Sequence, residues 1–206
     1  MSPWRMSGLA KVPTSVLTYV TDCARRLQQN PGDPDGLFAR ALIFAALGRP
    51  TQARESVQLL ARVAPRHPAV LQVRIHGSLD LDALEGVSDT VLRYVNACAQ
   101  RLDRNPKDAD ALFTRAAILA TLGQHEDALR SLETLAKVAP QYPAVWRLKA
   151  RLYKELGDLK TAELCVRAAE RFEAEQEGKE PPSRPREKVS AEDAAKVRRL
   201  ILDEGE

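Results

Sequence analysis

The chain has 206 residues, of which 44% are hydrophobic and 29% are charged. This balance is typical of a soluble folded protein and excludes a wholly disordered chain. The formal net charge of +3 is too small to require a polyanionic partner. Alanine, leucine and arginine are abundant, whereas aromatic residues make up only 5%, and this composition favours helices.

Residues that could support catalysis or bind a metal are scarce. Three cysteines without CxxC spacing and three scattered histidines predict neither a disulfide framework nor a zinc site. Cys23 and Cys98 each follow a Tyr-Val pair at the same offset, so we expect small core residues there. The sequence also contains no GxxxxGK[ST], GxGxxG, HExxH or GxSxG motif. We therefore expect no enzymatic activity, no cofactor and no metal.

The start of the chain, MSPWRMSGLAKV, lacks the apolar run of a signal peptide. No apolar stretch is long enough to cross a bilayer. These features predict a cytoplasmic protein without a membrane partner.

An internal duplication organises the chain. Residues 13–75 align without gaps on residues 88–150, with about 30 identities in 63 positions. The spacing from Pro31 to Pro65 is 34, and so is the spacing from Pro106 to Pro140. The spacing from Pro65 to Pro106 is 41, and we call this stretch the long unit. The offset between the two copies, 75, is thus the sum of one ordinary unit and the long unit.

A unit of about 34 residues with small and apolar residues at fixed places resembles the tetratricopeptide repeat family. In the last unit the matching residues are Trp146, Ala150, Tyr153, Leu156, Gly157, Ala162 and Ala169. In the third unit they are Ala116, Leu122, Gly123, Ala128 and Pro140, and in the first they are Ala41, Phe44, Leu47, Gly48, Ala53 and Pro65. The resemblance implies an all-α fold, an α-solenoid of antiparallel helix pairs that forms a superhelix, and a role in binding other proteins.

The predicted elements follow in chain order after an N-terminal extension, residues 1–13. They are a lone helix at 14–29 and helix pairs at 34–65, 68–105, 109–140 and 143–177, which together form a repeat domain at 14–177. A linker rich in proline and charge, residues 178–189, precedes a short amphipathic accessory helix at 190–206.

Local signals set the ends of these helices. The first helix of a pair is predicted to end at Gly48, Gly123 or Gly157, because glycine tolerates the left-handed backbone needed there. Aspartates near helix starts can accept hydrogen bonds from free amides. The candidates are Asp33 or Asp35 and Asp108 or Asp110.

The extra residues of the long unit lie in HGSLDLDALEGVS, residues 76–88, which has no counterpart in the second copy. We expect an irregular connection between the two helices of that pair. The carboxylates of Asp80 and Asp82 lack further ligands nearby, so a solvated loop is the expected setting.

A basic helix face is the main candidate for partner binding. Arg147, Arg151 and Lys154 are spaced i, i+4, i+7 and share a face distinct from the apolar signature residues. In the tetratricopeptide family, basic residues on first helices often bind carboxylates of a partner peptide, and Arg147 and Arg151 lie at matching places. A solvated basic face is the alternative.

Two equivalent phenylalanines, Phe38 and Phe113, are further candidates. Each lies one position after a core leucine and is turned about 100° from the main apolar stripe. Each could line an apolar groove for a partner side chain or pack against a neighbouring helix pair.

These observations predict a scaffold or adaptor that binds a peptide or helix of another protein in the concave groove. The alternative is a self-assembling homo-oligomer that uses the repeat ends or the C-terminal segment. A nucleic-acid role through the basic N-terminal third, with Arg25, Arg26 and Arg40 as first candidates, is less favoured.

The predicted helix at 190–206 has three open roles: capping the last pair, docking in a groove of the repeats, or binding a partner helix. Its apolar positions are Ala194, Val197, Leu200 and Ile201. Its acidic end, residues 203–206, could also contact the face of Arg147, Arg151 and Lys154.

Overall fold

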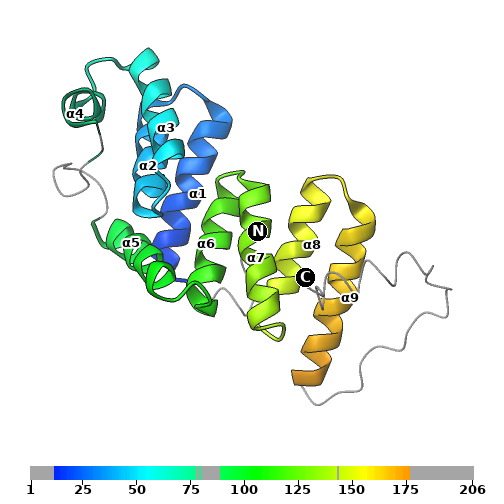
Figure 1. The fold of residues 1–206 in the computed structure, drawn as a ribbon. Helices are drawn as coiled ribbons and strands as arrows, with labels where there is room; N and C mark the ends of the chain where they lie inside the picture. The colour runs from blue at the N-terminus through cyan, green and yellow to red at the C-terminus, as the bar shows by residue number, and fades with distance from the viewer. Residues whose placement is uncertain (1–11, 78, 80–88, 143, 177–206) are drawn as a thin grey trace, which may run out of the picture. The chain divides into compact units, whose positions relative to one another are not determined.

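The computed structural model describes residues 12–77, 79, 89–142 and 144–176, and the regular secondary structure in these ranges is α-helical. The predicted all-α class with antiparallel helix pairs is confirmed (Figure 1). The chain forms two compact units, Val12–Gln124 and a unit whose described part starts at His125. Asp80, Asp82, the linker at 178–189 and the predicted helix at 190–206 lie outside the described residues.

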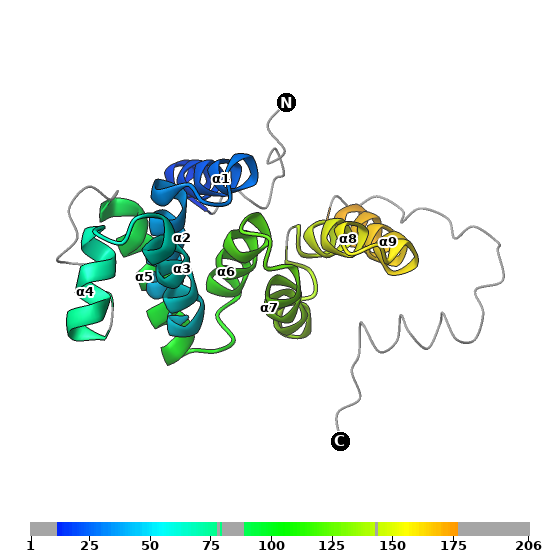
Figure 2. The same ribbon diagram turned by 90° about the horizontal axis from the view of Figure 1, so that it is seen from above.

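The first compact unit is built around the close packing of α2 on α3. Its helices are α1 (Thr14–Gln29), α2 (Pro34–Ala46), α3 (Pro50–Val63), α4 (Pro68–His76), α5 (Asp89–Arg104) and α6 (Ala109–Thr121). Helices α2 and α3 run antiparallel across a short turn, and α1 packs on α2 (Figures 1 and 2). Apolar residues at three-and-four spacing form the core between them: Leu37, Ala41, Val57, Leu60, Ala69 and Val70.

The second compact unit contains a second tight pair. Its helices are α7 (His125–Val138), α8 (Val145–Glu155) and α9 (Leu159–Gln176). Helices α8 and α9 run antiparallel and pack closely, and α7 packs on α8. Leu132, Leu135 and Leu152 are fully buried between them. This pair positions the basic residues of α8.

Aspartate side chains begin three of the helices. Asp33 accepts a hydrogen bond from the amide of Gly36, and Asp108 accepts one from Ala111. The capping residue is therefore Asp33 and not Asp35, and Asp108 and not Asp110. Asp158 caps α9 through the amide of Thr161.

Glycines end the first helices as predicted. Gly48, Gly123 and Gly157 have φ values of 69°, 76° and 83°. After each glycine the next amide reaches back to a carbonyl five residues earlier, as in Arg49 N–H to Phe44 O at 2.8 Å. This Schellman arrangement satisfies carbonyls that the helix leaves free and turns the chain sharply.

The three cysteines are buried free thiols, as expected for core residues. The Cys23 thiol donates to the carbonyl of Gly36 at 3.3 Å. Burial raises the pKa of Cys23 and of Cys165 to about 11, and it also raises the pKa of Cys98. These thiols therefore stay protonated near neutral pH.

The long unit differs from a simple helix pair. Within the described residues α4 packs on α3, whereas α5 packs on α1, α2 and α6 (Figure 1). Helices α4 and α5, which the repeat pattern assigns to one pair, are not closely packed on each other in this part of the chain. Among the described residues, the first helix of the long unit consequently has no neighbour equivalent to the one that α9 provides for α8.

We expect Gly48→Ala to lower the free energy of unfolding by about 1–2 kcal/mol, because a Cβ disfavours left-handed backbone. Apart from the adjoining residues, nothing lies within 4 Å of the added Cβ, so the loss reports backbone conformation alone. Urea unfolding followed by circular dichroism measures it. The control Gly32→Ala adds a Cβ with ordinary 3.5 Å contacts and without a positive φ. Equal losses in the two variants would contradict the assignment.

Candidate functional site

Helix α8 presents its basic residues on the side away from the core. Arg147, Arg151 and Lys154 are all exposed, as their spacing predicts. Trp146 and Ala150 on the neighbouring face are buried. The structure therefore brings the three basic residues together on one exposed helix face, within the second compact unit.

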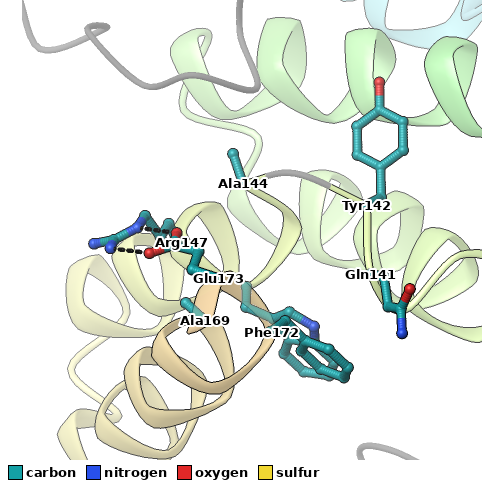
Figure 3. A pocket seen from close by; sticks show the side chains of 8 residues that line it. Gln141, Tyr142, Ala144, Arg147, Ala169, Phe172 and Glu173 are labelled. Atoms are coloured by element: carbon teal, nitrogen blue, oxygen red, sulfur yellow. Dashed lines mark hydrogen bonds and ion pairs between the residues drawn. The ribbon is translucent and has the colours of Figure 1, made fainter. Parts of the chain in front are cut away.

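Arg147 is held by an ion pair across the helix pair. Its Nε donates to Glu173 Oε1 of α9 at 2.6 Å, and its Nη2 donates to Glu173 Oε2 (Figure 3). This bidentate pair raises the pKa of Arg147 and lowers the pKa of Glu173. Both side chains are about two-fifths exposed, at 43% and 41%, so solvent screens the pair and its contribution to stability is small.

Arg151 is oriented by a neighbour on its own helix. Its Nε donates to Glu155 Oε1 at 2.8 Å, one turn later. The second oxygen of Glu155 lies 3.4 Å from His125 Nε2, at the start of α7. Glu155 thus links α8 to α7, and it partly balances the charge of Arg151.

A shallow depression that is partly open to solvent lies beside Arg147. It is lined by Gln141, Tyr142, Ala144, Trp146, Arg147, Ala169, Phe172 and Glu173 (Figure 3). The rings of Trp146 and Phe172 are stacked with centroids 5.9 Å apart. The Trp146 Nε1–H donates to the carbonyl of Pro140 at 2.8 Å, which fixes the indole in place.

The backbone at the edge of this pocket is strained. Ala144 precedes α8 with φ 63°, in the left-handed region that alanine rarely adopts. Strain of this kind often accompanies functional sites. The pocket therefore brings together the Trp146–Phe172 stack, the guanidinium of Arg147 and the strained turn at Ala144.

Sequence reasoning missed Lys149, which is only 1% exposed. Its Nζ lies 5.0 Å from the centre of the Trp146 ring, a cation–π contact. Burial lowers the pKa of Lys149, whereas Cys165 and Glu133 act in the opposite direction. Lys149 lies four positions after Val145 and three after Trp146, both buried, and this spacing was the available signal.

Part of the chain matches a known protein family. Residues 95–152 match the family model described as Tetratricopeptide repeat. The matched stretch runs from α5 into α8 and is similar to tetratricopeptide repeats. No curated protein and no solved structure matches the chain. Tetratricopeptide repeats generally mediate protein–protein interactions, and the family is typically a non-catalytic interaction module.

Within this repeat protein the two candidate phenylalanines differ. Phe113 of α6 is 1% exposed, so its ring forms part of the core and does not line an open groove. Phe38 of α2 is partly buried against the first core, and its ring centroid lies 4.7 Å from that of His67. Both contacts agree with packing, the alternative to a groove residue.

The arginines of the basic N-terminal third are engaged within the chain. Arg25 and Arg26 pair with Asp22, and Arg26 also donates to Asp35 at 3.1 Å. Arg40 is partly buried and donates to Ser56 at 3.1 Å. These pairs reduce the charge that a nucleic acid would meet.

Two features are absent from the residues that the structure describes. None of the helices there has the length and apolar character needed to cross a bilayer. The same residues contain no group of three or more His, Cys, Asp or Glu side chains that could hold a metal ion.

We expect the free energy of unfolding to depend on pH through His67. Its Nδ1 accepts the amide of Ala69 at 3.2 Å and so caps α4, which requires the neutral ring. Burial lowers the pKa of His67, although Asp35 acts in the opposite direction. The unfolded chain therefore takes up a proton first as pH falls below 6.5, and stability declines from there downward.

We expect His67→Asn to retain the cap and to remove this contribution between pH 7.5 and 5.5, a window that spans the unfolded pKa of about 6.5. Urea unfolding at several pH values measures the slope in the wild type and in the variant. An unchanged slope in His67→Asn would contradict the assignment.

Proposed function

We propose that the chain is a non-catalytic scaffold or adaptor that binds a peptide or helix of a partner protein along α8. The observation that carries this proposal is the pocket between α8 and α9, where the Trp146–Phe172 stack adjoins the Arg147–Glu173 pair. Such a site joins an apolar surface to a directed cation. Peptide recognition commonly relies on this combination.

The pocket would take an apolar side chain of the partner. Buried aromatic contacts supply most of the affinity of typical interfaces, whereas partly exposed ion pairs contribute roughly 0.2–1 kcal/mol each. The stack of Trp146 on Phe172 is fixed by the indole hydrogen bond to Pro140. Trp146 is only 4% exposed, so the partly exposed ring of Phe172 would supply the apolar contact, and a ring held in place loses little conformational entropy on binding.

The basic residues would select a partner with carboxylates. Arg147 uses Nε and one Nη2 hydrogen for Glu173, which leaves the Nη1 hydrogens directed elsewhere. Lys154 is exposed one helix turn from Arg151. Carboxylates along the bound segment would meet the Nη1 hydrogens of Arg147 and the ammonium of Lys154, so the bound segment is expected to be acidic.

Two alternatives stay open as predictions. Self-assembly would use the repeat ends or the C-terminal segment. Nucleic-acid binding through Arg25, Arg26 and Arg40 is disfavoured by their internal partners. A cytoplasmic setting also stays a prediction.

The test uses peptides selected from a random display library on the full chain. We expect Arg151→Glu/Lys154→Glu to weaken the selected peptides by at least about tenfold, which is about 1.4 kcal/mol, because two attractive charges become repulsive. Fluorescence anisotropy measures the dissociation constants. The matched control is Arg167→Glu on α9, where an exposed arginine paired with Glu163 is reversed in the same way.

A charge swap separates binding from stability at Arg147. Arg147→Glu/Glu173→Arg restores an ion pair between α8 and α9 but reverses the charge on α8. We expect the swap to restore the thermal stability that Arg147→Glu loses, but not the peptide affinity that it loses.

Peptides that bind Arg151→Glu/Lys154→Glu as tightly as they bind the wild type would show that the binding face was assigned wrongly.

A further inference from the structure

Helix α9 ends beside the candidate pocket. Its last residue is Gln176, and the pocket residues Phe172 and Glu173 lie one turn before that end. Gln176 is therefore only about 6 Å further along the helix axis than Phe172. The chain that follows α9 starts next to the pocket, and this depends on the geometry of α9 alone.

The exposed cations of α8 extend away from this pocket. Helices α8 and α9 are antiparallel, so Arg147, near the start of α8, lies beside the end of α9 and pairs with Glu173 (Figure 3). Arg151 and Lys154 follow about 6 Å and about 10 Å further along α8. Glu155 offsets part of the charge of Arg151, whereas Lys154 forms no ion pair among the described residues. A ligand that runs from the pocket along α8 thus meets apolar surface first and positive charge afterwards.

The C-terminal segment, residues 190–206, carries apolar and then acidic residues in the matching order. The apolar side of its predicted helix is formed by Val197, Leu200 and Ile201. The acidic residues that follow are Asp203, Glu204 and Glu206. From Ile201 to Glu206 the chain covers about 8 Å as a helix or about 17 Å when extended. The spacing from the pocket to Arg151 and Lys154 falls within this reach.

We propose that the C-terminal segment of the same molecule occupies the site on α8 and competes with the partner. In this arrangement Leu200 and Ile201 contact Phe172, and the acidic end of the segment contacts Arg151 and Lys154. The inference rests on the proposed function of this site, to which it adds a regulatory occupant. The segment is too short to form a stable helix alone, and docking would supply the packing that it needs.

The tether favours the segment of the same molecule over that of a second copy. The thirteen residues between α9 and the segment, 177–189, can span up to about 43 Å when extended. This exceeds the length of α8, whose 11 residues rise about 16 Å. A tethered segment has an effective concentration of the order of millimolar. A second copy in a dilute solution is much less concentrated.

Cysteine alkylation tests the docking in the full chain. Gln141 is exposed and lines the pocket, so Gln141→Cys places a thiol where the segment would cover it. The native thiols are buried and have raised pKa values, so N-ethylmaleimide reacts selectively with the introduced thiol. Adding Asp203→Lys/Glu204→Lys should release the segment. If the segment is docked nine-tenths of the time, the introduced thiol then reacts about tenfold faster.

A second charge reversal identifies the contact. In the Gln141→Cys chain, Arg151→Glu/Lys154→Glu should also release the segment and speed alkylation. Combining this change with Asp203→Lys/Glu204→Lys should restore the slow rate, because the acidic and basic groups exchange places. Additive effects of the two reversals would contradict a direct contact.

A matched control is Glu163→Cys on α9, where the native side chain is 67% exposed. Glu163 lies nine positions before Phe172, so the two side chains point to opposite sides of the helix. We expect the alkylation rate of the control thiol to be the same with and without the substitutions in the segment.

Peptide affinity separates this proposal from the proposed function. If both hold, Asp203→Lys/Glu204→Lys raises the affinity of the selected peptides about tenfold, because a site that was free one-tenth of the time becomes fully available. An unchanged affinity with the expected alkylation pattern would confirm the docked segment and show that the peptides bind elsewhere. That result would overturn the proposed function of the site and not the docking.

The docking itself is overturned by any of three results. Rapid alkylation of Gln141→Cys in every variant would show that the segment does not cover the pocket. Slow alkylation that the segment substitutions leave unchanged would assign the cover to another part of the chain. Protection lost on dilution would assign it to a second copy.

Discussion

The first helix of each repeat unit is apolar on two sides. The packing of the unit depends on whether other helices cover both of these sides. In α2 one side packs on the preceding helix α1 and the other packs on α3, the second helix of its own unit. Helix α8 satisfies both requirements, with α7 on one side and α9 on the other. The α8–α9 pair thereby fixes the aromatic stack and the Arg147–Glu173 pair that define the candidate site. Helix α4 satisfies only one requirement among the described residues.

Ion pairs within the chain determine which basic side chains can bind a partner. Arg25, Arg26 and Arg147 all donate to carboxylates of the same chain. Such exposed pairs add little stability. The pair with Glu173 does, however, orient the guanidinium of Arg147 before a partner binds, and this lowers the entropic cost of binding. In the described part of the chain Arg62, Arg66 and Arg74, on or next to α3 and α4, form no such pairs. They differ in this respect from the arginines of α1 and α8.

Much of the fold could be predicted from the sequence because its signals are local. A glycine that must adopt positive φ, an aspartate that caps a helix and an alanine at a close helix crossing act within a few residues. The positions of Gly48, Gly157 and Asp33 illustrate this. The duplication added the unit length, and the resemblance to tetratricopeptide repeats followed from the residues at fixed places in each unit.

The features that escaped prediction are tertiary. Glu173 is far from Arg147 in the sequence, so their ion pair depends on how α9 lies beside α8. The burial of Phe113 and of Lys149 depends on which neighbours cover α6 and α8. The separation of α4 from α5 reflects the longer connection of that unit, whose sequence carries no pattern that sets the position of the next helix.

Amide hydrogen exchange provides the most direct test of the central claim, that α8 has a neighbour on both sides and α4 on only one. The measurement uses the full chain. Amides in the last turn of α4 should then exchange at least about tenfold faster than those in the last turn of α8, because local opening exposes fewer packed contacts. Equal protection of the two helices would contradict the account.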